Sequence, residues 1–358
     1  MKKYLLYVSQ LYSLSIMRPL QAVIRERGDE CAWFFDRSEA GTAQLLADEK
    51  QLKTVAEVKL YNPLAVFVPG NVVPDFFPGI KVQIFHGLAT DDTGKKGHYR
   101  IRGFFDLYCT RGPEETSKFQ ALADRYGHFR VVETGWPKLD PLFSAKSDVS
   151  LRSELPSEKP IILYASTFSP SLTSAPDLYE TIRLLSKNDQ WHWLVTLHPK
   201  MDKGVVDRYR QLAGPNLTFF ESSEDVLPLL KAADVMLCDT SSIAIEFQVL
   251  GKPLVTFRAK SPGPQQLDVR VPAEVQGALT HALQMPSDLM AATRIFTDRL
   301  HPWYDGLSSQ RVLEAVDMFL LPGQVELKRK PLNILRKWKV RRKLRYYKVF
   351  CNTDGAHQ

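Results

Sequence analysis

The sequence is poor in cysteine and has no long apolar run. Its 358 residues include four cysteines, with no CxxC pair and no histidine at zinc-finger spacing. This argues against a disulfide scaffold and a structural zinc site, and it fits a reducing compartment. No apolar run reaches the roughly 18 residues of a membrane-spanning helix. Polar residues interrupt the apolar run near the N-terminus, so we expect a buried strand over 3–9 in place of a signal peptide, and a cytoplasmic protein.

Several short enzyme motifs are also missing. There is no GxGxxG loop, no Walker lysine and no GxSxG elbow, which argues against dinucleotide-binding enzymes, P-loop NTPases and α/β-hydrolases. There is no DxD or HExxH, and the adjacent acidic pair Asp91 and Asp92 is a weak candidate for a metal site. We therefore expect neither a metal ion nor another cofactor.

The composition that remains is that of a globular protein with an uneven charge. Hydrophobic residues make up 44% and charged residues 24%, and the length suits two domains of ordinary size. Eleven Lys or Arg and no Asp or Glu lie between Lys328 and Lys348, which accounts for the net charge of +7. Without that segment the chain has 36 basic and 40 acidic residues, a net charge of −4. We therefore do not expect nucleic acid to bind over the whole protein.

The basic tail also contains apolar and aromatic residues. Basic residues near an anionic lipid surface are attracted by about 1 kcal/mol each, and aromatic rings anchor at the headgroup level. The tail is therefore expected to bind an anionic membrane surface, with RNA or DNA contact and a solvated tail as alternatives. The apolar positions do not form one clean helical stripe. They are Leu332, Ile334, Leu335, Trp338, Leu344, Tyr346, Tyr347 and Phe350.

Short apolar runs alternate with polar, helix-like stretches along both halves of the chain. This alternation predicts parallel βαβ units and two doubly wound, Rossmann-like α/β domains. The predicted domains are 1–145 and 161–325, joined by a polar linker over 146–160 and followed by the tail over 326–358. The predicted strands are 3–9, 31–35, 65–70, 81–87, 104–110, 129–137, 161–167, 191–199, 217–222, 235–242 and 253–257. The predicted helices are 17–27, 42–53, 113–126, 176–187, 202–212, 224–232 and 242–251, followed by a mostly helical stretch to about 319.

Hydroxyl residues cluster at one strand end in the second half. Asp239, Thr240, Ser241 and Ser242 lie between a strand and a helix. Ligands of open α/β sheets bind beyond the carboxyl ends of the strands, and a helix start with hydroxyl donors suits a phosphate or pyrophosphate. One turn into the helix, Glu246 is placed to accept hydrogen bonds from a ribose diol. The alternative is that a serine here only caps the helix.

Two histidines also end predicted strands, one in each half. His86 precedes Gly87, and His198 precedes Pro199. With the active site between two such domains, we expect these histidines to face each other across it. A histidine near its usual pKa of about 6.5 can act as a general base, or can neutralise a departing phosphate when protonated. For each one alone, a structural role remains the alternative.

Three further segments place polar residues after predicted strands or before a helix. Thr167 is at the end of the strand 161–167, and Lys138 and Asp140 follow the strand 129–137. Asp305 precedes a helix that is expected to begin near Ser308. That helix start is either another phosphate-binding point or an ordinarily capped helix.

Together these motifs occur in the order found in one family. The chain resembles the CDP-glycerol glycerophosphotransferases, which include teichoic acid primases and polymerases of the glycosyltransferase-B architecture. The resemblance covers roughly residues 60 to 320. It rests on the pair 86–87, TGWPKLD at 134–140, YASTF at 164–168, the pair 198–199, the segment 239–253 and the segment 305–311.

The resemblance implies a reaction and residue roles. An acceptor hydroxyl attacks the β-phosphate of CDP-glycerol, or a related CDP-linked donor, and CMP leaves. The acceptor is a lipid-linked or glycan molecule of the cell envelope, and the protein is expected on the inner face of the cell membrane. His86 corresponds to the proposed base and His198 to a histidine near the pyrophosphate. The donor-binding positions are Thr167, Thr240, Ser241 and Ser242.

The sequence also departs from the family pattern. Lys138 stands where the family usually has arginine, and a longer run follows Gly87 than the family shows. These departures leave the donor head group and the acceptor open. A nucleotide-sugar glycosyltransferase or a sugar-nucleotide epimerase of the same fold is the alternative enzyme. An RNA-binding or scaffold protein that uses the tail is the alternative without catalysis.

Overall fold

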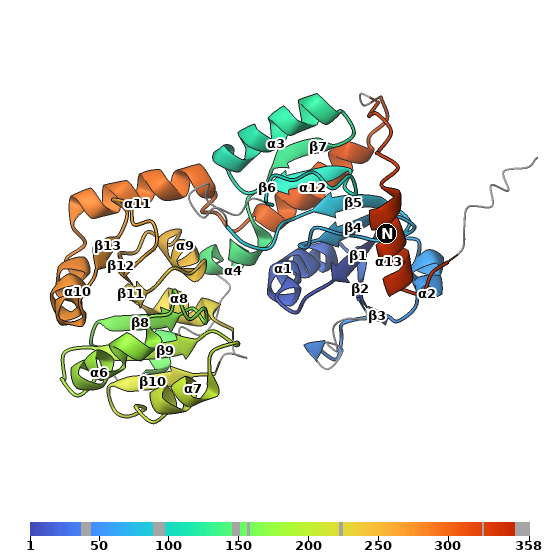
Figure 1. Ribbon diagram of the computed structural model, residues 1–358. Coiled ribbons are helices and arrows are strands. Elements are labelled where there is room, and N and C mark those ends of the chain that lie inside the picture. Colours follow the sequence, from blue (N-terminus) through green and yellow to red (C-terminus); the bar gives the residue numbers. More distant parts are fainter. Residues whose placement is uncertain are drawn as a thin grey trace, which may run out of the picture.

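Two open parallel sheets form the centres of the two halves of the protein (Figure 1). The computed structural model describes residues 1–36, 44–88, 97–144, 151–155, 158–221, 225–323 and 326–347. The first sheet has the strand order β3-β2-β1-β4-β5-β6-β7. Its strands are β1 (Lys3–Val8), β2 (Glu30–Phe35), β3 (Gln51–Leu52), β4 (Ala65–Val68), β5 (Ile80–Gln83), β6 (Leu107–Thr110) and β7 (Arg130–Glu133).

The second sheet repeats the same plan with the order β10-β9-β8-β11-β12-β13. In the first sheet, successive strands are added on one side of β1 up to β3 and then on its other side from β4 onward. The second sheet changes direction in the same way between β8 and β11. Such a reversal is the place where doubly wound folds bind ligands. The strands are β8 (Ile161–Ser166), β9 (His192–Leu197), β10 (Leu217–Phe220), β11 (Val235–Cys238), β12 (Leu254–Phe257) and β13 (Leu267–Val269).

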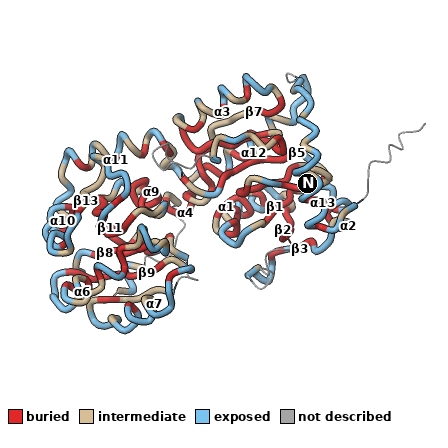
Figure 2. The backbone as a smooth tube through the Cα atoms, viewed as in Figure 1, coloured by how far each residue is buried: buried red, intermediate tan, exposed pale blue. Residues whose placement is uncertain are grey.

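Helices flank both sheets, and their outer faces are exposed whereas the strands are buried (Figure 2). The central strands are buried because helices cover both of their faces, which explains their continuous apolar sequences. This arrangement confirms the predicted fold class. The helices are α1 (Ser13–Glu26), α2 (Val55–Tyr61), α3 (Pro113–Tyr126), α4 (Asp140–Phe143), α5 (Leu151–Glu154), α6 (Ala175–Leu185), α7 (Lys203–Arg210), α8 (Leu227–Ala232), α9 (Ile243–Gln248), α10 (Val275–Leu283), α11 (Ser287–Leu300), α12 (Ser308–Leu320) and α13 (Ile334–Lys343), with the 3-10 helix η3 (Pro137–Leu139) before α4.

The predicted helix over 42–53 is wrong in its described part. Residues 44–53 contain the short edge strand β3, which pairs with β2 at Trp33 and Phe34. Pairing at the sheet edge outweighs the helical preference of this segment. The prediction missed α2, although Thr54 and Glu57 carry the Thr-x-x-Glu signal of a helix start: Thr54 Oγ1 accepts from Glu57 N at 3.1 Å.

The last part of the predicted second domain belongs with the first sheet. Helix α12 packs against α1 and β6, and Lys2 forms an ion pair with Asp317 on that helix. The chain therefore returns to the first domain after α11, whereas we predicted a second domain running to 325. Of the predicted linker 146–160, residues 146–150 and 156–157 lie outside the described residues, and the rest includes the one-turn helix α5.

The basic tail is docked on the first domain as far as the structure describes it. Helix α13 lies beside the first sheet (Figure 1), and Val340 in this helix and Leu344 directly after it are buried in the apolar core of that domain. Lys330 binds Asp106 at 2.6 Å, so the segment before α13 is fixed as well. The rest of the predicted membrane-binding segment, from Lys348 onward, lies outside the described residues. Within the described part of the chain, no helix has both the length and the apolar character needed to cross a membrane.

Candidate active site

A hollow of about 290 Å³ lies beyond the carboxyl ends of β8, β9 and β11. We call it the His198 hollow. Most of its lining comes from the second domain, and Lys138 reaches it from η3 of the first domain. It is lined by Lys138, Ala165, Ser166, Thr196, Leu197, His198, Pro199, Val226, Ser241, Ser242, Ile243 and Glu246.

Asp239 lies behind the lining of the His198 hollow and binds Ser166, which is part of that lining. We call this support the floor of the hollow. The buried carboxylate of Asp239 accepts hydrogen bonds from Ser166 Oγ at 2.5 Å, Thr167 N at 2.9 Å, and Ser174 N and Oγ at 2.9 and 3.0 Å. Burial raises the pKa of Asp239 above its usual range, and these four donors oppose that shift. Because both oxygens are occupied, we assign Asp239 to joining the ends of β8 and β11 and not to substrate. Thr167 lies at the same junction.

The hydroxyl residues after Asp239 divide into two groups. Thr240 Oγ1 accepts from Lys260 N at 3.0 Å, so this hydroxyl holds the loop that follows β12. Ser241 and Ser242 line the hollow. Ser242 precedes α9, but its side chain makes no capping hydrogen bond. The alternative drawn from the sequence, that this serine only caps the helix, therefore does not apply to the hydroxyl of Ser242.

Lys138 and Glu246 form an ion pair between the two domains. Lys138 Nζ lies 2.7 and 2.6 Å from the two oxygens of Glu246, and both side chains are largely buried. Both oxygens of Glu246 already contact Lys138. If Glu246 binds a ribose diol as expected, the same oxygens must accept hydrogen bonds from the diol and from Lys138. The pair places a positive and a negative charge at the wall of the His198 hollow.

His198 presents a hydrogen-bond donor at the mouth of this hollow. Its Nδ1 accepts a hydrogen bond from Lys200 N at 3.0 Å, so in the neutral ring the proton is on Nε2. Phe168 packs on the ring with centroids 4.4 Å apart. Burial, together with the nearby charge of Lys200, lowers the pKa of His198. This shift favours the neutral imidazole.

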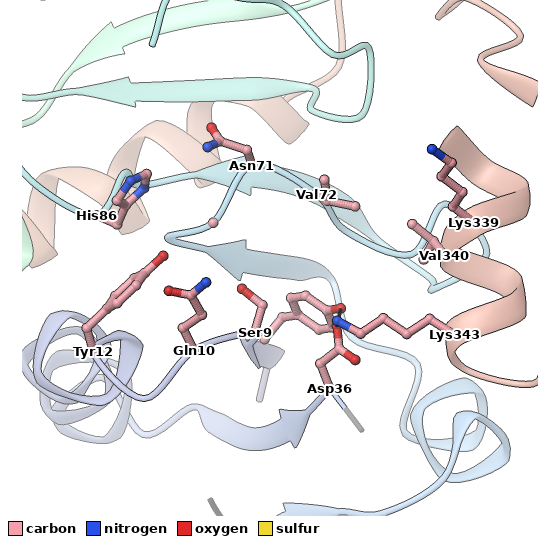
Figure 3. A pocket seen from close by; sticks show the side chains of 12 residues that line it. Ser9, Gln10, Tyr12, Asp36, Asn71, Val72, His86, Lys339, Val340 and Lys343 are labelled. Atoms are coloured by element: carbon pink, nitrogen blue, oxygen red, sulfur yellow. Dashed lines mark hydrogen bonds and ion pairs between the residues drawn. The ribbon is translucent and has the colours of Figure 1, made fainter. Parts of the chain in front are cut away.

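His86 lies in a different hollow, of about 460 Å³, at the carboxyl ends of β1, β2 and β4 (Figure 3). We call it the His86 hollow. The Nδ1 of His86 lies 3.1 Å from the carbonyl oxygen of Pro69. A carbonyl only accepts, so Nδ1 carries a proton, and in the neutral ring Nε2 has the lone pair. Tyr12 stacks on the ring with centroids 5.5 Å apart. The tautomer is the reverse of the one at His198.

A buried cluster fixes the backbone that carries His86. Phe85 has a φ of +57°, a left-handed conformation that is unfavourable for a bulky residue. Its ring packs against Arg111 at 5.0 Å and against His98. Both of these residues bind the carboxylate of Glu115. Burial alone raises the pKa of Glu115, but Arg111 and His98 outweigh it and lower that pKa to about 2.

The structure does not bring all predicted site residues together. His86, with Gly87 beside it, and His198 line separate hollows and do not face each other within one. Asp140 binds the start of α12, since its oxygens accept from Ser308 N at 2.9 Å and Ser309 N at 2.7 Å. Asp305 pairs with Arg311 in the first turn of the same helix.

The start of α12 is therefore occupied by a carboxylate of the protein and is not open to a phosphate. Within the described residues, Asp140 and Asp305 hold this returning helix. We assign both to structure and not to substrate binding.

Sequence reasoning missed the polar lining around His86. Ser9 and Gln10 follow β1, and Gly70 and Asn71 follow β4. These residues stand at the reversal of strand order in the first sheet. The signal was present, because they follow predicted strands in the same way as the hydroxyl cluster of the second domain.

Comparison with known proteins places these motifs in a family. The model of the family described as CDP-glycerol:poly(glycerophosphate) glycerophosphotransferase matches residues 86–318. The chain belongs to this family. This confirms the resemblance drawn from the sequence. The matched region begins at His86 and includes both strand-end histidines, the hydroxyl cluster and most of α12.

Individual relatives of the family are distant. The teichoic acid glycerol-phosphate primase of Bacillus subtilis (strain 168) is 25% identical over 239 residues, covering 63% of this chain and 61% of that protein. This chain thus spans about 60% of that relative's length.

Two solved structures share the fold. The wall teichoic acid polymerase TagF soaked with CDPG has a TM-score of 0.63 at 16% identity and covers 89% of each chain. The UDP-GlcNAc 2-epimerase of Neisseria meningitidis bound to UDP-GlcNAc has a TM-score of 0.60 at 15% identity, covering 89% of this chain and 100% of that chain. At these identities the likeness shows the fold alone.

Proposed function

We propose that the protein transfers glycerol phosphate, or a similar polyol phosphate, from a CDP-linked donor to a hydroxyl of a cell-envelope acceptor, and releases CMP. The observation that carries the proposal is the pair of strand-end histidines in opposite tautomers. His86 offers the lone pair of Nε2 to a proton, and His198 offers Nε2–H to an anion. One group suits an attacking hydroxyl and the other a phosphate oxygen.

In the proposed step, the acceptor oxygen attacks the β-phosphorus while His86 Nε2 takes the hydroxyl proton. A new oxygen–phosphorus bond forms, and the bond between this phosphorus and the oxygen of the CMP phosphate breaks. CMP leaves with the electron pair. Hydrogen bonds from His198, Ser241 and Ser242 meet the charge on the phosphate oxygens. Fixed donors of this kind act without reorganisation during the reaction.

Lys138 supplies positive charge at the donor side in this proposal. Its ammonium lines the His198 hollow and lies against Glu246. A pyrophosphate in the hollow brings further negative charge to the same ammonium, which favours binding. The two histidines line separate hollows, so the reaction requires the two domains to approach each other when donor and acceptor are bound.

The family and the polymerase TagF that was soaked with CDPG support the proposal of a CDP-linked donor. The experiment is CMP release from CDP-glycerol by the purified protein, with and without a cell-envelope extract as acceptor. We expect CMP release from CDP-glycerol that depends on the extract, and we expect no turnover of UDP-GlcNAc. Turnover of UDP-GlcNAc with none of CDP-glycerol would support the sugar transferase or epimerase alternative and would contradict the proposal.

The proposed location is the inner face of the cell membrane. Helix α13 has an outer surface on which Leu335 and Trp338 are 78% and 51% exposed, among basic residues. Exposed apolar side chains among positive charges suit an anionic lipid surface. Lipid attachment through this surface would bring a lipid-linked acceptor to the first domain.

A further inference from the structure

The His86 hollow has a wall made by the C-terminal helix. Lys339, Val340 and Lys343 of α13 line the same hollow as His86, about 250 residues earlier in the chain (Figure 3). His86 and Tyr12 lie at one end of the hollow, and Lys339 lies at the other. The volume of about 460 Å³ falls in the usual range of roughly 300–1,000 Å³ for small-molecule sites.

Helix α13 is built into this wall. Val340 and Leu344 are 7% and 5% exposed and belong to the core of the first domain. Between them, Arg341 binds Asp75 at 2.8 Å and lies over the ring of Phe76 at 4.9 Å. A largely buried ion pair and two buried apolar side chains fix the rotation of the helix. The direction in which Lys339 and Lys343 point therefore follows from the packing.

The charges at the tail end of the hollow are mainly positive. Lys343 Nζ lies 2.7 Å from Asp36 Oδ2, and Tyr7 donates to the same oxygen at 2.9 Å. Asp36 thereby balances one lysine. Among the described residues, Lys339 has no carboxylate partner. One positive charge is thus left over in a half-enclosed polar space, where an anion would be its natural partner.

Among the described residues, the lining near His86 is rich in uncharged hydrogen-bonding groups. Ser9, Gln10 and Asn71 offer a hydroxyl and two amides between His86 and the lysines (Figure 3). The close approach of β1 and β4 shapes this part, since a Cβ on Gly70 would lie 2.8 Å from Ser9 Oγ. Groups of this kind recognise polyol or sugar hydroxyls.

We propose that the His86 hollow binds the phosphate-bearing end of the acceptor. The terminal hydroxyl lies at His86, the polyol or sugar lies along Ser9, Gln10 and Asn71, and the preceding phosphate binds Lys339 and Lys343. The basic tail is then part of the acceptor site as well as a membrane contact. This inference rests on the proposed transfer reaction. It predicts an acceptor that carries a phosphate one or two units behind its reacting hydroxyl.

The test is acceptor binding without donor, measured by calorimetry on the full chain. Two probes carry the phosphate: a glycerol-phosphate trimer, and a disaccharide linked to farnesyl diphosphate. The third is the same disaccharide as an uncharged methyl glycoside. The double variant Lys339→Gln/Lys343→Gln should weaken binding of at least one phosphate probe about tenfold or more, the loss of one charge-assisted contact.

The matched control is Lys337→Gln/Arg342→Gln, which removes two charges from α13 at positions outside the hollow. We expect the control to bind all probes as the unaltered protein does, and Lys339→Arg/Lys343→Arg to restore binding. Preference for the trimer would identify a polyol-phosphate chain as the source of the phosphate. Preference for the diphosphate would identify a lipid-linked unit.

Equal binding by the double variant and the unaltered protein would overturn the inference, as would equal loss in the control or no binding of either phosphate probe. Binding of CDP-glycerol is measured in parallel on the same variants. Failure of CDP-glycerol to bind the unaltered protein would contradict the proposed function, independently of the acceptor probes. Loss of donor binding in Lys339→Gln alone would overturn the assignment of this lysine to the acceptor.

Discussion

The two hollows stand at equivalent places in two sheets of the same topology, yet they are assembled differently. The His198 hollow is built almost entirely from strand ends within residues 165–246, with Lys138 added from η3. The His86 hollow combines the ends of β1, β2 and β4 with α13, from the far end of the chain. One site is nearly local in sequence, and the other requires the return of the chain to the first domain.

This difference indicates where each site is open to variation. The floor of the His198 hollow is held by Asp239, whose four hydrogen bonds leave little freedom. The wall of the His86 hollow is a helix attached through Arg341, Val340 and Leu344, so a change in the tail alters the site without disturbing the sheet. Under the proposed function, the donor site is therefore held by the sheet, and the acceptor site is formed in part by the tail.

The largest expected effect is on activity, and it compares substitutions of the two histidines, whose tautomers differ. His86→Gln removes the lone pair of the base, and we expect kcat for CMP release to fall by about 100-fold to 10,000-fold. His198→Gln keeps an N–H donor, so it should retain more activity than His86→Gln. The measurement is steady-state CMP release.

His281→Gln, at an exposed position on α10, is the control and should behave as the unaltered protein. Equal loss in both histidine variants would show that the two hollows do not divide the reaction as proposed. Full activity of His86→Gln would reject its role as base.

The next effect tests the fixed floor of the His198 hollow. Asp239→Asn replaces an acceptor of four hydrogen bonds by a side chain with one acceptor atom, and we expect a loss of about 2–4 kcal/mol in the free energy of unfolding. The measurement is urea unfolding followed by circular dichroism. Asp189→Asn, at an exposed ion pair with Lys159, should change stability little. A similar loss in both variants would contradict the special role of Asp239.

A buried histidine near η3 predicts a dependence of stability on pH. His301 Nε2 accepts from Trp136 N at 3.0 Å, and burial lowers the pKa of His301 to about 4. Between pH 6.5 and 4 the unfolded chain binds this proton and the folded protein does not, so stability falls as pH is lowered, by up to about 3 kcal/mol.

The measurement is the free energy of unfolding at pH 7 and at pH 4.5. Carboxylates titrate in the same range, so the comparison is with His301→Gln, whose stability should fall less over the same interval. An identical fall in both proteins would show that His301 contributes nothing to the pH dependence.

The smallest expected effect concerns the outer surface of α13. Trp338→Ala should reduce binding to vesicles that contain phosphatidylglycerol several-fold, because an exposed ring no longer anchors at the headgroup level. Sedimentation with vesicles measures this. CMP release with a soluble acceptor should stay unchanged, and added salt should weaken vesicle binding of both proteins. Unchanged sedimentation would place the membrane contact elsewhere.

Sequence reasoning succeeded where a site follows from one short segment. The rule that ligands lie beyond strand ends pointed to His198, Ser241 and Ser242, and the structure brings these together with Lys138 and Glu246 in one hollow. The same rule placed Asp239 near the site, but its burial and hydrogen bonds assign it to the floor. A residue type and a position do not reveal whether a carboxylate faces a ligand or the protein.

The sequence by itself determined two parallel α/β units, their strand ends and the basic tail, because apolar periodicity and turn residues act over a few neighbours. Only the tertiary structure decided that α12 returns to the first sheet and that α13 closes the His86 hollow. Those contacts join residues hundreds of positions apart. They depend on the hydrogen bonds of Asp140 at the start of α12 and on the packing of Val340 and Leu344 in the core. Such long-range contacts cannot be predicted from the pattern of neighbouring residues.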